Sequence, residues 1–318
     1  MVDACDKIRY LLDKACKSVL SESILLSGGL DSSILLLYTK PKTAITIAIN
    51  RLSSDYKYSS FIAKKFETRH NVIHPEINVI IECLDELVSD YKTFDPIFLR
   101  NMVVQLIGFQ KLVEMNCKSV VIGDGADELF GGYNFLHRYH KEPIILESKL
   151  QFLIRNMNFV SKNLAKKYRL NIHSPFLNED IIEFAQSLPG RDKVAEYNGT
   201  IFGKYLLRKC FEGALGQEIV WRKKEAMESG SGMSQFMTTF NKRISEEEFI
   251  EGCRIAKMDK VIIRDIEHLY FYQTYRKHFP APINDPANKN LGFKICSYCR
   301  SSFRWEGSFC KVCGSYPV

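Results

Sequence analysis

The chain contains no hydrophobic run that approaches 18 residues, no low-complexity tract and no internal repeat. Because a membrane-spanning helix needs about 20 apolar residues, we expect none here. Residues 1–6 are polar and lack the apolar core of a secretory signal, so we expect a cytoplasmic protein. The composition, 46% hydrophobic and 25% charged, excludes a mainly disordered chain, a collagen-like or coiled-coil rod and a small disulfide scaffold.

The charge balance is mildly basic, with 44 Lys+Arg against 37 Asp+Glu and a formal net charge of +7. An excess of this size is more typical of a soluble surface than of a nucleic-acid-binding surface. The length of 318 residues allows a sizeable core and predicts about two domains.

Short apolar segments alternate with helical segments in the first part of the chain. Strands are expected at 23–26, 44–49, 72–74 and 119–122, and helices at 4–20, 31–38, 57–68, 78–90 and 100–116. This alternation predicts an α/β fold, with a parallel sheet and helices on both of its faces. Further helices are expected at 143–168, 178–187, 200–211, 233–240 and 245–278. A proline-rich linker at 280–290 then separates a domain at 1–279 from a small module at 291–318.

The ten cysteines fall into two groups. Six are scattered and are expected to be buried or inert thiols in a reducing compartment: Cys5, Cys16, Cys83, Cys117, Cys210 and Cys253. The other four form two CxxC pairs: Cys296, Cys299, Cys310 and Cys313. Two such pairs present four thiolates to one ion, which predicts a tetrahedral Zn²⁺ site; free or disulfide-bonded cysteines are the alternative. Four aromatic residues are expected to form the small core of this zinc ribbon: Tyr298, Phe303, Trp305 and Phe309.

A glycine-rich turn at 27–33 follows the first expected strand and opens a helix. Its sequence is Ser27-Gly28-Gly29-Leu30-Asp31-Ser32-Ser33. Two glycines allow a sharp turn, and the helix-start N–H groups and serine hydroxyls then form an anion site suited to phosphate. The GxxxxGK[ST] pattern of other nucleotide triphosphatases is absent. An aspartate beside a phosphate fits a bridging cation, so Asp31 is a candidate Mg²⁺ ligand, with a simple helix N-cap as the alternative.

A second turn, GDGADELFGGY at 123–133, follows the fourth expected strand. Three carboxylates, those of Asp124, Asp127 and Glu128, would repel one another in a plain surface turn. At the carboxyl end of a parallel strand they lie where α/β sheets bind ligands. Opposite the first turn they are suited to hold Mg²⁺ or to move a proton, and a bland acidic loop is the alternative.

Both turns resemble those of one enzyme family. SGGLDSS resembles the pyrophosphate-binding loop of the N-type ATP pyrophosphatases, and GDGADELFGGY resembles the signature of the asparagine synthetase synthetase domain. Further similar segments follow in order: 172–178 with 184–189, 204–208, and 221–225 with 229–230. The resemblance covers about residues 4–278. It implies an adenine-nucleotide α-hydrolase-like fold and an AMP-forming ligase that adenylates an aspartate-like carboxylate for attack by ammonia or another amine, as in asparagine biosynthesis.

The resemblance also implies roles for individual residues. Backbone and hydroxyl groups of the first turn hold the departing pyrophosphate: Ser27, Gly28, Gly29, Ser32 and Ser33. Asp31 and Asp127 bind Mg²⁺ on the phosphates of ATP. The adenosine is lined by Leu26, Ile47, Ile122 and Gly123. Lys224, assisted by Lys204, stabilises charge on the phosphates, and Asp124 occupies the general-base position.

The sequence departs from the family pattern in several places. Val2 stands where glutamine-using members carry a nucleophilic cysteine, and the first motif begins only 26 residues in. We therefore expect no glutaminase domain, and ammonia from solution or from a separate partner. Asn178 replaces a usual aspartate and Ala226-Met227 replaces a usual aromatic-containing stretch, so the acid substrate is left open. The cysteine module is an addition that is suited to bind RNA or a carrier protein, or to serve as a structural cap.

Two other functions remain open from the sequence. A zinc-ribbon ATP pyrophosphatase can instead modify tRNA or another macromolecule-bound substrate. A non-catalytic nucleotide-binding protein is the other alternative, although Asp31, Asp124, Asp127 and Lys224 are all present.

Overall fold

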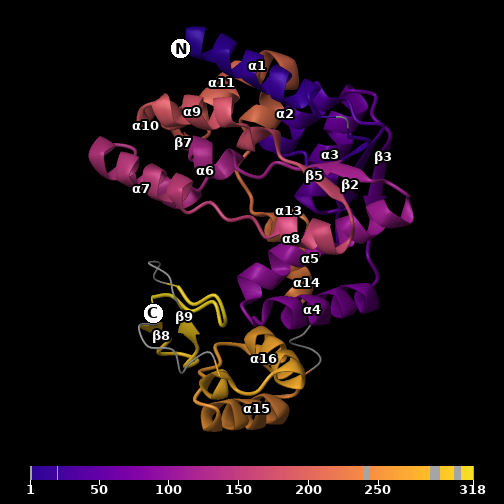
Figure 1. The fold of residues 1–318 in the computed structure, drawn as a ribbon, viewed down its shortest axis with the longest axis vertical. Helices are drawn as coiled ribbons and strands as arrows, with labels where there is room; N and C mark the ends of the chain where they lie inside the picture. The colour runs from indigo at the N-terminus through magenta and orange to yellow at the C-terminus, as the bar shows by residue number, and fades with distance from the viewer. Residues whose placement is uncertain (1, 20, 239–243, 287–293, 304–308, 318) are drawn as a thin grey trace. The chain divides into compact units, whose positions relative to one another are not determined.

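The computed structural model describes residues 2–19, 21–238, 244–286, 294–303 and 309–317. Within these ranges, no helix has both the length and the apolar character needed to cross a membrane. The chain forms two compact units, the first from Met1–Ile73 and Gly108–Glu225 and the second from His74–Ile107 and Ala226–Val318 (Figure 1). Predictions for Trp305, for the Phe303 side chain and for linker residues 287–290 lie outside the described residues.

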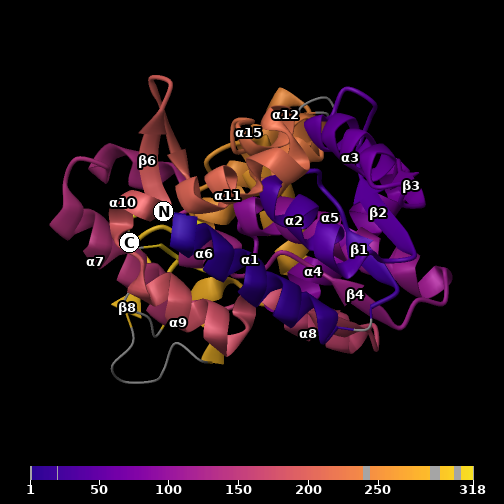
Figure 2. The same cartoon turned by 90° about the horizontal axis from the view of Figure 1, so that it is seen from above.

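A five-stranded parallel sheet organises the first unit, in the order β3-β2-β1-β4-β5. Its strands are β1 (Ser23–Leu25), β2 (Thr43–Ile47), β3 (His70–Ile73), β4 (Ser119–Val121) and β5 (Asn171–His173). Figure 2 shows β3, β2, β1 and β4 in this order. Every residue of β2 and β4 is buried, as expected for strands covered by helices. The predicted α/β fold is confirmed, and β5 is a strand that the sequence analysis did not predict.

Helices of the first unit surround a main apolar core and a smaller cluster that contains Leu146 and Leu150. They are α1 (Val2–Lys17), α2 (Leu30–Thr39), α3 (Ser54–Lys65), α6 (Ala126–Phe130), α7 (Pro143–Arg155), α8 (Ser161–Lys167), α9 (Glu179–Ser187), α10 (Gly190–Lys193), α11 (Tyr205–Leu215) and α12 (Gln217–Val220). Ile8, Leu12 and Ile34 in α1 and α2 have no exposed surface. Two short 3₁₀ helices, at Asn134–Tyr139 and Pro175–Leu177, also belong to this unit.

A disulfide joins Cys5 in α1 to Cys210 in α11, so the prediction that these two residues are free thiols was wrong. Their Cα atoms lie 5.0 Å apart, but 205 residues separate them in sequence. Local sequence patterns cannot reveal such a pairing, because it exists only after α1 and α11 pack together. Cys16 and Cys83 are buried, as predicted.

Three predicted helices were wrong in extent. Residues 143–168 form α7 and α8 rather than one helix, and residues 245–278 form α15 (Glu246–Met258) and α16 (Ile266–His278). The expected helix at 200–211 instead begins as a strand, because β6 (Val194–Tyr197) and β7 (Thr200–Gly203) pair as an antiparallel hairpin. Its two-residue turn, Asn198-Gly199, has positive φ at both positions and is a hairpin signal that the sequence analysis overlooked.

The second unit contains α4 (Ile77–Tyr91), the start of α5 (Pro96–Glu114), α13 (Met227–Gly230), α14 (Met233–Met237), α15 and α16. A 3₁₀ turn at Pro282–Asn284 lies within the predicted linker. The cysteine module adds one short hairpin, β8 (Lys294–Ile295) with β9 (Ser302–Phe303). Asp265 caps α16 by accepting a hydrogen bond from the His268 amide at 2.8 Å, which explains where that helix begins.

Candidate functional site

The turn at 27–33 connects the carboxyl end of β1 to the first turn of α2. Gly28 has a φ of +65°, and a Cβ at this position would collide with the backbone of Tyr58 and Ser59 in α3. Only glycine fits there without strain. The Ser27 and Ser32 hydroxyls lie 3.2 Å apart, and the Gly29 amide donates to Ser27 Oγ at 3.2 Å. The turn therefore gathers the small polar groups that the sequence analysis assigned to phosphate binding.

Two polar atoms in this turn are buried without a hydrogen-bond partner among the described residues, Asp31 Oδ1 and Ser33 Oγ. An unsatisfied buried polar group costs free energy, so native structures rarely retain one without a reason. Both atoms belong to the pattern SGGLDSS, which therefore contains buried polar groups without a partner among the described residues.

The second turn approaches the first where strands β4 and β1 end side by side. A Cβ added to Gly123 would lie 3.1 Å from Asp31 Cβ, so the two turns touch. At Gly132 a Cβ would collide with the carboxylate of Asp127 and with Lys204 Cε. The glycines of GDGADELFGGY thus make room for the charged groups around them.

Two carboxylates and two ammonium groups form one cluster across these turns. Lys204 Nζ lies 2.5 Å from Asp31 Oδ2 and 2.6 Å from Asp127 Oδ1, and Lys224 Nζ lies 2.7 Å from Asp127 Oδ2. Four residues from distant parts of the sequence therefore meet, and all four were predicted site residues. The formal charges of the four groups sum to zero.

The electrostatics of the cluster favour the charged forms of Lys204 and Asp127. Burial works against the charge of Lys204, but the carboxylates of Asp127 and Asp31 outweigh it and raise the pKa of this lysine. Burial also opposes the charge of Asp127, yet Lys204 and Lys224 lower the pKa of its carboxyl well below the usual range. Preorganised opposite charges of this kind are typical of sites that bind charged ligands.

Lys204 is held by its backbone as well as by its side chain. It adopts a left-handed conformation, with φ of 56°, at the N-cap of α11. Its amide donates to the Phe130 carbonyl at 3.0 Å, and the side chain is only 3% exposed. A non-glycine residue in this conformation is uncommon and marks a position that the fold constrains. The hairpin β6–β7, which leads directly into it, delivers this lysine to the cluster.

Asp124 lies in the same turn but has a different partner. In the described part of the chain, its carboxylate accepts a hydrogen bond from the Ser161 hydroxyl of α8, and neither lysine of the cluster bonds to it. Burial raises the pKa of Asp124 to about 6, although the Ser161 hydrogen bond acts to lower it. A carboxylate with this pKa is suited to accept a proton near neutral pH. The neighbouring Glu128 accepts a hydrogen bond from the Tyr133 hydroxyl at 2.6 Å.

Arg222 is a site residue that the sequence analysis missed. Its guanidinium donates to the Gly28 carbonyl at 3.0 Å, lies 3.6 Å from Asp55 Oδ1 and stacks 4.2 Å from the centre of the Tyr58 ring. These contacts fix a carbonyl of the turn at 27–33. Arg222 lies two residues before Lys224 in a matched motif, and that motif could have identified it.

The apolar residues assigned to adenosine occupy the ends of neighbouring strands. Leu26 follows β1, Ile47 ends β2, and Ile122 follows β4. All three are buried, with at most 4% of their surface exposed. They share the edge of the sheet on which Asp31 and Asp127 lie, which is the side where α/β sheets place ligands.

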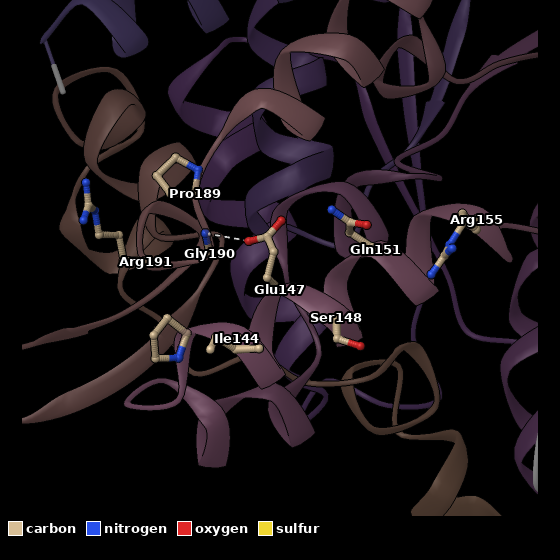
Figure 3. A pocket seen from close by; sticks show the side chains of 9 residues that line it. Ile144, Glu147, Ser148, Gln151, Arg155, Pro189, Gly190 and Arg191 are labelled. Carbon is tan, nitrogen blue, oxygen red and sulfur yellow. Dashed lines mark hydrogen bonds between the residues drawn. The ribbon is translucent and has the colours of Figure 1, made fainter.

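A cavity of about 590 Å³ lies elsewhere in the first unit, between α7 and the start of α10. Figure 3 shows Arg191 and Arg155 at its two ends, with Glu147 between them accepting a hydrogen bond from the Gly190 amide at 3.1 Å. None of the predicted site residues lines this cavity. The predicted site residues lie around the charged cluster and not in this cavity.

The four CxxC cysteines converge in the second unit. Their sulfur atoms all lie within 4.8 Å of one another, and each residue is at most 1% exposed. The predicted cluster of Cys296, Cys299, Cys310 and Cys313 therefore exists as a group of four buried sulfurs. Its donor set is the one that structural zinc sites use.

Comparison with known proteins adds to this geometry. The family model described as asparagine synthase matches residues 7–167 and 145–258, so the chain belongs to the asparagine synthase family. At the level of the family, the chemistry is ATP-dependent amide synthesis by a ligase.

The curated relatives are distant in sequence. Asparagine synthetase B (glutamine-hydrolyzing) of Escherichia coli is 26% identical to this chain, and the matched region covers 96% of this chain and 59% of the relative. The glutamine-hydrolyzing asparagine synthetase of Asparagus officinalis is 24% identical and covers 90% and 52%. The chain thus spans about half the length of the curated relatives it matches.

One solved structure also matches in part. It is a predicted subunit of tRNA methyltransferase from Methanocaldococcus jannaschii, at 15% identity and a TM-score of 0.29, covering 62% of this chain and 90% of its own. A likeness of this degree says nothing about function.

Proposed function

We propose that this protein adenylates a carboxylate with ATP and passes the acyl group to ammonia or another amine. The observation that carries the proposal is the cluster of Asp31, Asp127, Lys204 and Lys224 at the ends of β1 and β4. It places two carboxylates suited to a cation and two ammonium groups beside a turn built for phosphate. Within this family, the simplest assignment is an aspartate-like acid as the substrate and asparagine as the product.

The reaction balances in two steps. A carboxylate oxygen of the acid attacks the α-phosphorus of ATP, the bond between that phosphorus and the bridging oxygen breaks, and pyrophosphate leaves. The amine then attacks the acyl carbon, the bond to AMP breaks, and a proton leaves the nitrogen. Charge develops on the α-phosphate and pyrophosphate in the first step, and Lys224, assisted by Lys204, stabilises that charge. Asp124 accepts the proton in the second step.

The residues present fit a magnesium ion. Asp31 Oδ1 is buried without a hydrogen bond in the described part of the chain, and Asp127 Oδ1 contacts Lys204 at 2.6 Å. Carboxylate oxygens are the ligands that Mg²⁺ prefers. Asp31 and Asp127 would hold the ion. When bound, Mg²⁺ would neutralise phosphate charge. The turn at 27–33 then orients the pyrophosphate through its amides and its hydroxyls.

The proposal is tested by measuring AMP and pyrophosphate release from ATP. The assay presents aspartate with ammonium, a panel of other acids and amines, and bulk tRNA, with Asp31→Ala as the control. Asparagine formation that disappears in Asp31→Ala supports an ammonia-using synthetase. Release of AMP and pyrophosphate only with another acid or with tRNA would change the substrate assignment and leave the proposed mechanism unchanged. ATP binding without turnover under every condition contradicts the proposal and favours the non-catalytic alternative.

The pH dependence of the rate is expected to report the carboxyl group of Asp124. Burial raises its pKa to about 6, so the base is protonated and inactive in acid. The rate is therefore expected to rise through about pH 6 to a plateau and to be about tenfold lower at pH 5. Protonation of Asp124 does not lower the rate by unfolding the protein. A carboxyl group whose pKa is raised by folding stabilises the folded chain most in acid, and that contribution declines as the pH passes about 6.

Ser161→Ala supplies the matched variant for this prediction. The Ser161 hydroxyl lowers the pKa of Asp124, so its removal should move the acid limb of the rate to higher pH. Asp127, Glu128 and Lys162 also act on Asp124, and all three are unchanged in this variant. A limb that stays in place in Ser161→Ala would assign the titration to another group.

Arg222→Lys is expected to raise the KM for ATP about tenfold, because a hydrogen bond from a charged group contributes about 1.5–3 kcal/mol. Lysine keeps the charge but loses the planar fork that reaches both the Gly28 carbonyl and Asp55. Inhibition by pyrophosphate should weaken by a similar factor, while the KM for the amine stays constant. Lys223→Met, at an exposed neighbour, is the control. Equal weakening for ATP and amine would indicate a general structural defect.

A further inference from the structure

The cysteine module contains a repeat that the sequence analysis did not detect. Residues 296–301 and 310–315 both read Cys-x-x-Cys-x-Ser. In each, the amide of the first cysteine donates to the serine carbonyl at 2.9 Å. The fifth residue, Arg300 or Gly314, has a left-handed backbone and donates back to the carbonyl of the first cysteine. The two segments are therefore two copies of one knuckle.

The sulfur positions match a metal centre better than disulfides. Cys296 Sγ lies 3.7 Å from Cys313 Sγ, and Cys299 Sγ lies 3.8 Å from Cys310 Sγ. Four sulfurs that each lie about 2.3 Å from a tetrahedral zinc ion are about 3.8 Å apart. Both of these distances join one knuckle to the other, so an ion would bind the two copies together.

The repeated serines contact the sulfurs. Ser301 Oγ lies 3.1 Å from Cys299 Sγ and 3.3 Å from Cys310 Sγ, and Ser315 Oγ lies 3.2 Å from Cys313 Sγ. Both serines are buried, at 4% and 2% exposure. Without an ion, the Cys313 thiol donates to the Ser315 hydroxyl. A thiolate that binds a metal has no proton to donate, so with an ion bound each hydroxyl would become the donor. Such hydrogen bonds spread the negative charge of four thiolates around one divalent ion.

The second knuckle is built into the second unit through its backbone. The Phe94 amide donates to the Val312 carbonyl at 2.7 Å, and Arg264 donates to the carbonyls of Cys313 and Gly314 at 2.9 and 3.0 Å. A Cβ at Gly314 would collide with the carboxylate of Asp95. This packing explains why glycine stands here while arginine occupies the equivalent position of the first knuckle.

The first knuckle is attached to the same segment as Arg264. The Ile262 amide, which precedes α16, donates to the Tyr298 carbonyl at 2.9 Å. His268 of α16 stacks on Phe94, with ring centres 5.2 Å apart. The cysteine centre thus lies where the start of α5 meets the segment that leads into α16. The second knuckle holds both segments, through Phe94 and Arg264, and the first knuckle holds only the segment before α16, through Ile262.

We propose that Cys296, Cys299, Cys310 and Cys313 bind one zinc ion, that Ser301 and Ser315 support its thiolates, and that the centre fixes the segments at 93–95 and 262–264. The module is then an integral brace of the second unit. Its inward carbonyls are already committed to Phe94, Ile262 and Arg264. The inference does not depend on the proposed function.

The test uses the full chain loaded with zinc. Competition with a chelator measures zinc affinity in Ser301→Ala/Ser315→Ala, with the exposed Ser297→Ala as the matched control. The double variant is expected to bind zinc about 10–100-fold more weakly, and the control is expected to match the original protein. Hydrogen exchange then compares the zinc-loaded and zinc-free chains. Protection of the Phe94 and Ile262 amides should fall at least about tenfold without zinc. The Ile122 amide, which donates to His173 within the first unit, should be unaffected.

Three results would overturn the proposal. One is a chain that binds no zinc when its cysteines are reduced. Another is a double serine variant that binds zinc as tightly as Ser297→Ala does. The last is equal protection of the Phe94 and Ile262 amides with and without zinc, which would show that the metal holds only its own loop.

Discussion

Replacing Lys224 with methionine is expected to lower the rate of ATP-dependent amide formation by about 10²–10³-fold, the loss typical for one group that stabilises transition-state charge. Lys224 Nζ lies 2.7 Å from Asp127 Oδ2, and the lysine side chain is 30% exposed. The group is therefore placed to leave the carboxylate and reach a phosphate oxygen. Its partner Asp127 keeps a second cation, Lys204, so the fold should tolerate the change.

Lys223→Met is the matched control for this prediction. It removes a lysine from the adjacent, exposed position and should leave the rate within about twofold, as for most surface changes. Thermal unfolding of both variants should resemble that of the original protein. Similar rates in Lys224→Met and Lys223→Met would remove Lys224 from the catalytic machinery.

Replacing the buried Lys204 with methionine is expected to destabilise the first unit by about 3–5 kcal/mol, the cost of leaving a buried charge without its partner. Lys204 is 3% exposed and bridges Asp31 and Asp127, so its loss leaves two carboxylates facing each other with only Lys224 nearby. Folding lowers the pKa of Asp127, and its contribution is therefore full at neutral pH. The contribution declines only as the pH falls below the ordinary carboxyl value of about 4.

A second variant separates charge from packing. Lys204→Met/Asp31→Asn removes one carboxylate together with the lysine and should recover a large part of the lost stability, because neighbouring charges couple strongly. Urea unfolding at neutral pH measures both variants. A Lys204→Met protein as stable as the original would contradict the role assigned to this ion pair.

The site residues that could be predicted from the sequence lie within short contiguous motifs. SGGLDSS and GDGADELFGGY each follow a buried strand, and parallel strands that are neighbours end at the same edge of a sheet. Asp31 and Asp127 could therefore be placed together before any coordinates. Lys204 and Lys224 could be chosen only through the resemblance, since nothing in their local sequence distinguishes them from other lysines.

Other features were not predicted, because they depend on packing between segments that are far apart in the sequence. The Cys5–Cys210 disulfide and the Arg222–Gly28 contact each join positions about 200 residues apart. The hairpin at 194–203 was assigned to a helix even though Asn198-Gly199 is a turn signal. In the same way, the repeated serines of the cysteine module were visible in the sequence, but their meaning came from the short distances to the sulfurs.

The most direct test of the proposed adenylation step is to trace an oxygen atom of the acid's carboxylate into the products. The acid is supplied with ¹⁸O in its carboxylate, together with ATP, Mg²⁺ and ammonium, and the products are analysed by mass spectrometry. Adenylation predicts that each amide formed transfers one ¹⁸O to AMP, because the carboxylate oxygen that attacked the α-phosphorus leaves with it. Label in inorganic phosphate, with ADP as the nucleotide product, would mean attack at the γ-phosphorus and would contradict the account.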